Sequence, residues 1–355
     1  MAQDTTRTLL TKDYSISRIL KGGWQLAHGH SINSIDKEKA IEDMFAFAQS
    51  GITTFDFGDA YVGVEDLVGA FLKSYKEKFG GERFNDIQTH TKFIPDLEIL
   101  PTITKEYVEN GIDRSLKRLG VEKLDLVQFH YWDYDVPNYV ETAHYLVDLQ
   151  KKGKIKNIGV TNFDVPHFKE LVDSGVPIVS NQVQYSVLDH RPEHGMVEFC
   201  QKNNIKLLCY GTAAGGFLSE KYLNVAEPKE PFENRSLVKY KLIIDDFGGY
   251  ELFQELLRCL DKIAKKHGVS LTNVASRYIL QKPQVAGVII GARNTNHLEE
   301  NLKVFSFELD ASDLFSIEKI TKKSKGPIGD TYELERIKGG KHAVIMKYNL
   351  NKENE

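Results

Sequence analysis

Short apolar runs alternate along the chain with longer segments whose apolar residues recur every three or four positions. The longer segments, such as "DKEKAIEDMFAFAQS" and "TKEYVENGIDRSLKRLG", have the period of amphipathic helices, and Gly120 closes the second at a C-cap position. Eight runs rich in Val, Ile, Leu, Phe and Tyr predict strands: "RILKGGWQLA", "GITTFDFG", "DIQTHTKF", "LDLVQFHYW", "IKNIGVTNF", "VPIVSNQVQYS", "IKLLCYG" and "VAGVIIGA". Nearly continuous apolar strands joined by helix-length crossovers are typical of a parallel sheet covered by helices.

The number of strand–helix units predicts how this sheet closes. Eight units in one chain predict an α/β protein of the (β/α)8 or TIM-barrel class. The competing fold is a doubly wound sheet, whose dinucleotide-binding form carries G-x-G-x-x-G after its first strand, and this chain has no such motif. A phosphate loop is also missing, because "GTAAGGFLS" has Phe217 where that motif needs lysine. The sequence therefore favours the barrel.

The ends of the chain predict additions to the barrel. Residues 5–15 are long enough for a small hairpin over the barrel bottom, before a barrel at about residues 15–322. Residues 323–355 are rich in Lys and Gly and contain no strand–helix unit. Their Pro and Gly punctuation predicts an extended tail lying over one face of the barrel. We expect residues 1–355 to form a single domain.

Composition excludes several classes of function. The chain has 355 residues, 27% of them charged, and a net charge of −4, so it lacks the basic excess of nucleic-acid-binding proteins. Its polar start has no signal-peptide core, and no apolar run approaches the ~20 residues that span a bilayer, so we expect a cytoplasmic protein without membrane contact. The three cysteines form no C-x-x-C pair, so we expect neither a disulfide framework nor a metal site.

Polar and aromatic residues stand where the predicted strands end, which is where barrel enzymes place their catalytic groups. Taken singly, each has an ordinary explanation: a turn aspartate, a solvated lysine or a core histidine. Several of them together have a common chemical use, which no single one shows. The residues, in strand order from the second strand to the seventh, are Asp56 followed by Tyr61, Lys92, His130, Thr161 with Asn162, Asn181 with Gln182, and Tyr210.

A tyrosine, a lysine, an aspartate and a histidine at one barrel mouth could protonate an oxygen while a hydride reaches carbon. A phenol, with a reference pKa near 10, is a poor acid at neutral pH unless a nearby cation favours its phenolate. Lys92 can supply that cation, and Asp56 can keep the ammonium protonated in a partly dry site. We expect His130 to donate a hydrogen bond that orients a carbonyl oxygen.

At these positions the chain resembles the aldo-keto reductases from about residue 15 to about residue 305. The stretches that carry the resemblance are "GITTFDFGDAYVGVEDLVG", "THTKF", "LDLVQFHYWD", "IGVTNF", "SNQVQYS" and "GVIIGARNTNHLEENL". The resemblance implies reduction of an aldehyde or ketone by NAD(P)H, reversible to oxidation of an alcohol. It makes Tyr61 the general acid or base, Lys92 and Asp56 its tuning pair, and His130 the residue that orients the carbonyl.

The resemblance also implies how NADPH would bind, with NAD(H) as a possible substitute. The chain departs from the family near the adenosine 2′-phosphate: Gly291, Ala292 and His297 replace the usual Lys, Ser and Arg. Arg293 remains as the strong cation there, and a guanidinium suits a phosphate. The implied contacts are Thr161, Asn162 and Gln182 with the nicotinamide amide, Tyr210 with its ring, Phe217, Leu218 and Ser219 with the pyrophosphate, Arg293 and His297 with the 2′-phosphate, and Glu300 and Asn301 with the adenine.

Three aromatic residues, Trp24, Tyr131 and Trp132, together with the tail, could form a wall for the apolar part of a carbonyl substrate. The alternative is that the two tryptophans are ordinary rim packing. A second function is also open, because potassium-channel β subunits resemble the same family and act as cofactor-binding regulatory partners. We expect a small carbonyl or alcohol substrate; the sequence does not reveal the oligomeric state.

Overall fold

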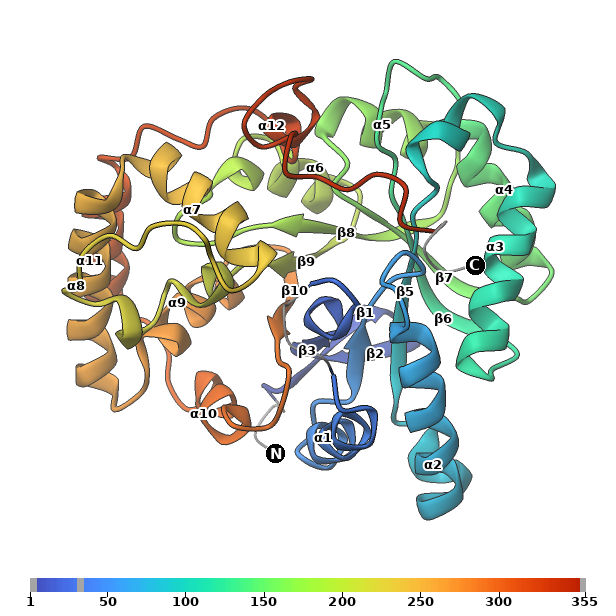
Figure 1. Cartoon of the computed structure of the whole chain (residues 1–355), viewed down its shortest axis with the longest axis horizontal. Coiled ribbons are helices and arrows are strands. Elements are labelled where there is room, and N and C mark those ends of the chain that lie inside the picture. The colour runs from blue at the N-terminus through green and yellow to red at the C-terminus, as the bar shows by residue number, and fades with distance from the viewer. Residues whose placement is uncertain (1–4, 31–34, 352–355) are drawn as a thin grey trace.

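Eight parallel strands form a closed barrel in the computed structural model, which describes residues 5–30 and 35–351 (Figure 1). The barrel closes because the last strand pairs with the first, with Val288 opposite Ile19. The predicted (β/α)8 fold is thus confirmed. Around the barrel the strands follow the order β10, β3, β4, β5, β6, β7, β8, β9. Their bounds are β3 Ile19–Gly22, β4 Thr54–Asp56, β5 Gln88–Phe93, β6 Leu124–Phe129, β7 Ile155–Thr161, β8 Ile178–Gln184, β9 Lys206–Tyr210 and β10 Val285–Gly291.

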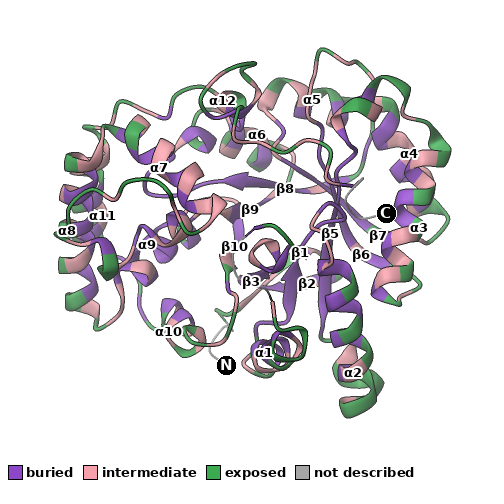
Figure 2. Ribbon diagram, viewed as in Figure 1, coloured by how far each residue is buried: buried purple, intermediate pink, exposed green. Residues whose placement is uncertain are grey.

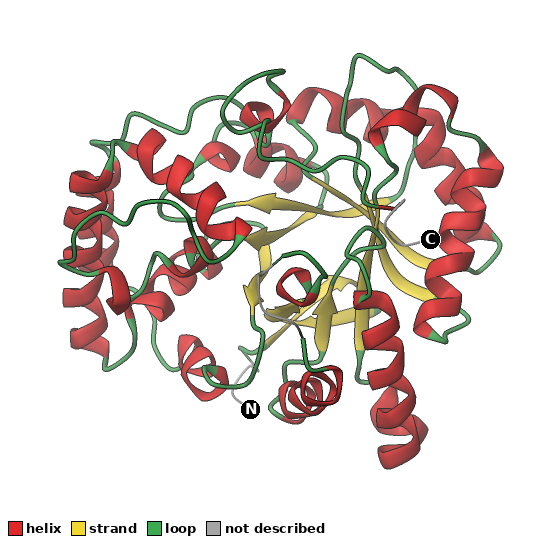
Figure 3. Cartoon of the chain, viewed as in Figure 1, coloured by secondary structure: helices red, strands yellow, loops and turns green. Residues whose placement is uncertain are grey.

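Helices surround the barrel, as Figure 3 shows. Local signals set their ends: the Thr104 hydroxyl accepts a hydrogen bond from the Tyr107 N–H where α3 begins, and α3 ends at Gly120 with a φ of 66°, which favours glycine. In the described part of the chain, no helix is long and apolar enough to cross a membrane. The bounds are α1 Lys37–Gln49, α2 Val64–Phe84, α3 Lys105–Leu119, α4 Tyr139–Lys151, α5 Val165–Asp173, α6 Met196–Lys202, α7 Arg235–Phe247, α8 Tyr250–His267, α9 Leu271–Leu280, α10 Leu298–Leu302, α11 Ala311–Thr321 and α12 Glu333–Arg336.

A two-stranded hairpin lies over the bottom of the barrel, as the sequence predicted. Its strands, β1 (Arg7–Thr11) and β2 (Tyr14–Ser17), pair antiparallel. The Tyr14 hydroxyl lies 3.1 Å from Nε2 of His90, which β5 contributes. The hairpin therefore seals one end of the barrel and leaves the other end for a site. Its apolar side chains and those of the barrel form one small cluster: Leu10, Tyr14, Ile16, Leu20, Leu126, Leu208 and Ala286.

The main hydrophobic core lies between the outer face of the barrel and the helices, so the strands are buried and the outer helix faces exposed (Figure 2). Alternation along β6 shows why. Val127 and Phe129 pack into this outer core, while Gln128 between them donates a hydrogen bond to Asp56 across the barrel interior. The upper barrel interior is therefore polar.

After α11 the chain crosses the open end of the barrel in a segment that has little regular structure apart from α12 (Figure 1). We call residues 323–351 the C-terminal segment. His342 lies 2.6 Å from Oδ2 of Asp246 on α7, and the Asn351 side-chain amide donates to the Ile94 carbonyl at 2.7 Å. The predicted extended tail is confirmed, and the face that it covers is the C-terminal end of the strands.

Candidate active site

A cavity of about 840 Å³ opens at the C-terminal end of the barrel strands. This is the end at which barrel enzymes hold their substrates, and the volume suits a ligand of cofactor size. Of the candidate residues named from the sequence, all except Tyr131, Asn181, Phe217 and Leu218 line it. The fold thus brings together residues that lie up to 277 positions apart, from Trp24 to Asn301.

A buried ion pair forms the floor of the cavity. The Lys92 ammonium at the end of β5 donates to Oδ1 of Asp56 at 2.5 Å and to the Phe57 carbonyl at 2.9 Å. The two side chains are 3% and 4% exposed. Burial alone would lower the pKa of Lys92, but the Asp56 carboxylate and Tyr61 outweigh it and leave that pKa raised. Lys92 is therefore a permanent cation at neutral pH.

Two glutamines hold the other oxygen of Asp56. Oδ2 accepts from Nε2 of Gln128 at 2.8 Å and from Nε2 of Gln182 at 2.7 Å, and Gln182 also donates to Gln128. We did not predict Gln128. Its signal was present, because in "LDLVQFH" it shares the inward parity of His130. Gln182, which we expected on the nicotinamide amide, uses both amide hydrogens within the protein and has only its carbonyl oxygen for a ligand.

Tyr61 stands beside the ion pair on the loop after β4. Its N–H donates to the Gly58 carbonyl at 3.0 Å, and its ring centre lies 5.1 Å from Nζ of Lys92 and 4.8 Å from the ring of Trp24. Burial raises the pKa of Tyr61, while the Lys92 cation opposes this effect. The side chain is therefore a protonated phenol with a cation ready to stabilise its phenolate.

His130 follows β6 and is fixed by the neighbouring strand. Its Nδ1 lies 3.1 Å from the Thr161 carbonyl, and because a carbonyl has no hydrogen, Nδ1 must be the donor. Burial, and next the charge of Arg336, lower the pKa of His130 to about 3, so the ring is neutral. Nε2, which is buried and has no partner, then carries a lone pair. This polarity is opposite to the hydrogen-bond donor that we expected from the sequence.

The residues expected at the nicotinamide lie together at the ends of β7, β8 and β9. Asn162 has a left-handed backbone, with a φ of 63°. Its Oδ1 accepts from the Tyr210 hydroxyl at 2.8 Å, which leaves its amide hydrogens for a carboxamide oxygen. The Thr161 hydroxyl donates to the Gln182 carbonyl at 3.2 Å, so it is partly occupied.

The loop expected at the pyrophosphate is arranged differently from our prediction. Phe217 and Leu218 are fully buried, and the Phe217 ring packs against Phe232 and Phe253, so neither side chain lines the cavity. Ser219 does, together with Gly215 and Gly216. Their small size lets a phosphate approach the backbone. Two further cations of the cavity wall, Lys221 and Arg235, were missed because a charged loop residue is no signal by itself.

The four residues expected around the adenosine all line the cavity after β10: Arg293, His297, Glu300 and Asn301. The Glu300 carboxylate is already bound at the start of α9. Its Oε1 accepts from the N–H of Ser270 at 3.1 Å and from Nδ2 of Asn273 at 2.9 Å. The position of Glu300 therefore supports a role in shaping the adenine end of the cavity.

The aromatic wall consists of Trp24 and Trp132, the second held by a hydrogen bond from Nε1 to the Pro95 carbonyl at 2.9 Å. Tyr131 is not part of it, because its ring is fully buried against Phe129 and Tyr139. The rest of the wall comes from the C-terminal segment, which we expected as a part of the wall without naming the residues that would line it. Its cavity-lining residues are Tyr332, Ile345, Met346, Lys347 and Leu350.

Comparison with known proteins agrees with this geometry. The Aldo/keto reductase family matches residues 18–322. Aldo-keto reductase YhdN of Bacillus subtilis is 28% identical over 326 residues, which cover 89% of this chain and 93% of that protein. The NADH-specific methylglyoxal reductase of Escherichia coli is 24% identical, with coverages of 85% and 94%. The crystal structure of a thermostable aldo-keto reductase with the inhibitor epalrestat has a TM-score of 0.69, 25% identity, and coverages of 88% and 98%.

The closed barrel and its polar mouth, with the paired Lys92 and Asp56 beside Tyr61, define a (β/α)8 barrel of the enzyme class whose site lies at the C-terminal ends of the strands. The chain belongs to the aldo/keto reductase family. Membership supports an oxidoreductase that acts on carbonyl compounds with a nicotinamide cofactor.

Proposed function

We propose that this protein reduces an aldehyde or ketone to the alcohol with NADPH, and catalyses the reverse reaction, with Tyr61 as the general acid or base. The observation that carries the proposal is a phenol on the cavity wall next to a buried, permanently charged lysine. When bound, the cofactor supplies a hydride to the carbonyl carbon. All other steps belong to side chains of the chain itself.

Tyr61 donates its proton to the carbonyl oxygen as that oxygen gains negative charge, which completes the alcohol and leaves a phenolate. Lys92 stabilises the phenolate, and Asp56 keeps Lys92 charged throughout the cycle. Solvent then returns a proton to Tyr61. His130, with a lone pair on Nε2, accepts a hydrogen bond from a hydroxyl group of the substrate or product.

Preference for NADPH over NADH is part of the proposal. Arg293 supports it, since a guanidinium on the cavity wall beyond β10 can bind the phosphate that distinguishes the two cofactors. Lys221 and Arg235 would face the pyrophosphate, which both cofactors share. The aromatic and apolar wall favours a carbonyl substrate with an apolar part.

The decisive experiment combines binding and turnover. NADPH and NADH are titrated by the fluorescence of the reduced nicotinamide, and the oxidation of each is then followed with a panel of aldehydes, ketones and sugars. Binding together with oxidation by at least one carbonyl supports the enzyme. Tight binding without any oxidation would instead support the regulatory role of a potassium-channel β-subunit type, and absence of binding would contradict both.

A further inference from the structure

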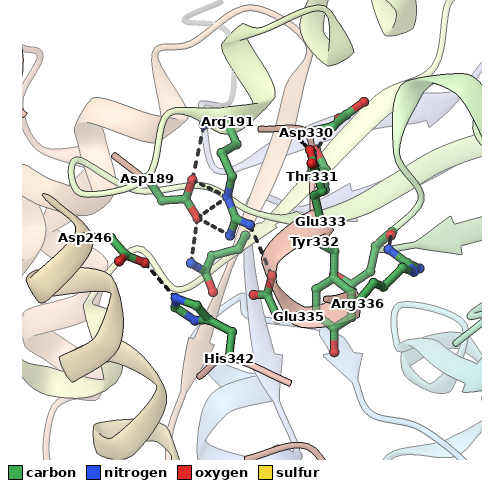
Figure 4. Close-up of polar contacts among 12 residues, drawn as sticks. Asp189, Arg191, Asp246, Asp330, Thr331, Tyr332, Glu333, Glu335, Arg336 and His342 are labelled. Carbon is green, nitrogen blue, oxygen red and sulfur yellow. Dashed lines mark hydrogen bonds and ion pairs between the residues drawn. The ribbon is translucent and has the colours of Figure 1, made fainter. Parts of the chain in front are cut away.

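The helix α12 lies at the barrel mouth, and two adjacent residues of it, with opposite charges, point to opposite walls (Figure 4). On one side Glu335, 2% exposed, accepts from Nη1 of Arg191 at 3.1 Å and lies 3.4 Å from Nζ of Lys239. These contacts tie the helix to the loop after β8 and to α7. The C-terminal segment is therefore fixed on this wall by buried charges.

On the other side Arg336 ties α12 to β6 and β7. Its Nη2 donates to the Tyr131 carbonyl at 2.8 Å, and its Nη1 donates to the Asn162 carbonyl at 2.9 Å. These two residues directly follow His130 and Thr161 in the chain, which are themselves joined by a hydrogen bond from the imidazole. Arg336 thus joins the ends of β6 and β7 a second time, one residue beyond the hydrogen bond between His130 and Thr161.

Aromatic rings fix the guanidinium above these carbonyls. Its central carbon lies 4.2 Å from the ring centre of Tyr134 and 5.1 Å from that of Tyr332. Tyr332 has a left-handed backbone, with a φ of 61°, and its ring stands perpendicular to that of His130 at 5.6 Å. A non-glycine residue keeps such a conformation only where its surroundings demand it. The C-terminal segment is therefore packed against His130 through Tyr332.

We propose that Arg336 is a positioning residue of the active site, which fixes the ends of β6 and β7 so that His130 and the Asn162 amide face the substrate and the nicotinamide. This inference rests on the proposed function, because it assigns those two residues their tasks. Loss of Arg336 would leave two carbonyls without their charged donor and free the strand ends to shift. Displacements of ~1 Å at such groups can cost on the order of 10²-fold in rate.

The test is the variant Arg336→Met, which keeps a long unbranched side chain but removes both donors and the charge. We expect the Kd values of NADPH and NADH to rise by a similar factor, about 10-fold, because both cofactors share the nicotinamide end. We expect kcat at saturating cofactor to fall on the order of 10²-fold. Lys338→Met is the matched control, because Lys338 is 73% exposed and bonds Asp133 and Asp135 at the surface.

A second readout reports whether the charge of Arg336 reaches His130, which a role in stability alone would not require, and it needs no cofactor. The titration of His130 is followed by NMR in the cofactor-free protein. Burial lowers its pKa most, followed by Arg336, whereas the hydrogen bond to the Thr161 carbonyl raises it by less than Arg336 lowers it. Lys92 and Lys239 add smaller effects that the variant retains. Arg336→Met should therefore raise the pKa of His130, and Lys338→Met should not.

Two results would overturn the inference: an Arg336→Met protein with Kd and kcat within about twofold of wild type, or one that loses both while its His130 titration is unchanged. Failure of the wild type to bind either cofactor would instead contradict the proposed function. In that case the titration decides whether Arg336 stands close enough to His130 to position it: an upward shift of the pKa supports that placement, and an unchanged pKa refutes the inference.

Discussion

The barrel mouth contains two buried charge clusters that do different things. In the first, Asp56 and Lys92 come from neighbouring strands, and Tyr61 beside them faces the cavity. In the second, Asp189 and Arg191 from one loop meet Glu335 of the C-terminal segment, and all three side chains are at most 1% exposed. The first cluster lies beside a phenol that faces the cavity, whereas the second binds two parts of the chain together.

The comparison shows that burial of charge does not by itself mark catalysis. Arg191 donates to Asp189 at 2.7 Å and to Glu335 at 3.1 Å, so its charge is fully used inside the protein (Figure 4). A buried pair costs desolvation that its own attraction only partly repays, so such clusters contribute specificity of structure as much as stability. The first cluster differs in that its neighbour on the cavity wall, Tyr61, is a phenol with a proton to give, whereas Lys239, the cavity-wall neighbour of the second cluster, is itself paired with Glu335.

The largest effect on turnover should follow from removing the hydroxyl group of Tyr61. Tyr61→Phe deletes the transferable proton, so kcat should fall by the ~10² to 10⁴-fold typical of general acid–base catalysis. Cofactor Kd and melting temperature should stay near wild type, because the ring remains. Tyr145→Phe on α4 is the control, since its hydroxyl bonds only Glu141, away from the cavity. A Tyr61→Phe enzyme with nearly normal turnover would refute the proposed role of Tyr61.

The second cluster should respond in stability rather than in chemistry. Glu335→Gln leaves the charges of Arg191 and Lys239 without their shared partner, which should cost about 3 kcal/mol of unfolding free energy. Denaturant titration measures this loss. Glu333→Gln, two residues earlier and exposed, should change little, because an amide oxygen still accepts from the Asp330 N–H. Equal free energies of unfolding for the two variants would show that the second cluster does not stabilise the fold.

The second cluster should also make the stability of the protein depend on pH. Burial alone would raise the pKa of Glu335, but Arg191 and Lys239 lower it from its ordinary 4.5 to about 2. A depressed pKa stabilises the fold fully above 4.5, and that contribution is lost as the pH falls from 4.5 to about 2. The wild type should therefore lose stability over this range more steeply than Glu335→Gln.

The contrast between the clusters also explains what the sequence could predict. Asp56, Lys92 and His130 end strands, and the barrel places every strand end at one mouth, so their meeting was predictable from position alone. Glu335 and Arg336 lie in a segment without periodicity, and their partners at Arg191 and Asn162 are fixed only by tertiary packing. The burial of the Phe217 and Leu218 side chains was not predictable, because a resemblance identifies a loop but not which way its side chains point.

The cofactor phosphate offers a perturbation outside both clusters. Arg293→Ala should weaken NADPH binding by about 1.5 to 3 kcal/mol, the scale of a hydrogen bond to a charged group, and leave NADH nearly unchanged. Fluorescence titration of both cofactors measures the ratio. Stability and the His130 titration should not move, unlike in the cluster variants. Equal weakening of the two cofactors, or of neither, would contradict the phosphate role and favour NADH as the partner.

The smallest expected effect is the coupling free energy between Lys92 and Asp56 in the proposed reaction. Lys92→Met removes the cation that opposes the effect of burial on Tyr61, so the pKa of Tyr61 and the apparent pKa of the reduction should rise. Asp56→Asn removes the counter-charge of the same lysine. Because each single change already breaks the 2.5 Å contact, the double variant should lose less than the sum of the singles, by about 0.5 to 3 kcal/mol in kcat/KM.

Strict additivity of the two losses would place Asp56 and Lys92 in separate roles. The control cycle uses Lys105→Met and Asp148→Asn, an ion pair at the same 2.5 Å distance whose side chains are 50% and 39% exposed. Solvent screens such a pair, so its coupling should be close to zero and should not appear in kcat/KM at all. If only the buried pair shows a coupling in kcat/KM, the pair acts on catalysis through the charge of Lys92 beside Tyr61. The distance between the charged atoms cannot explain such a result, because it is 2.5 Å in both pairs.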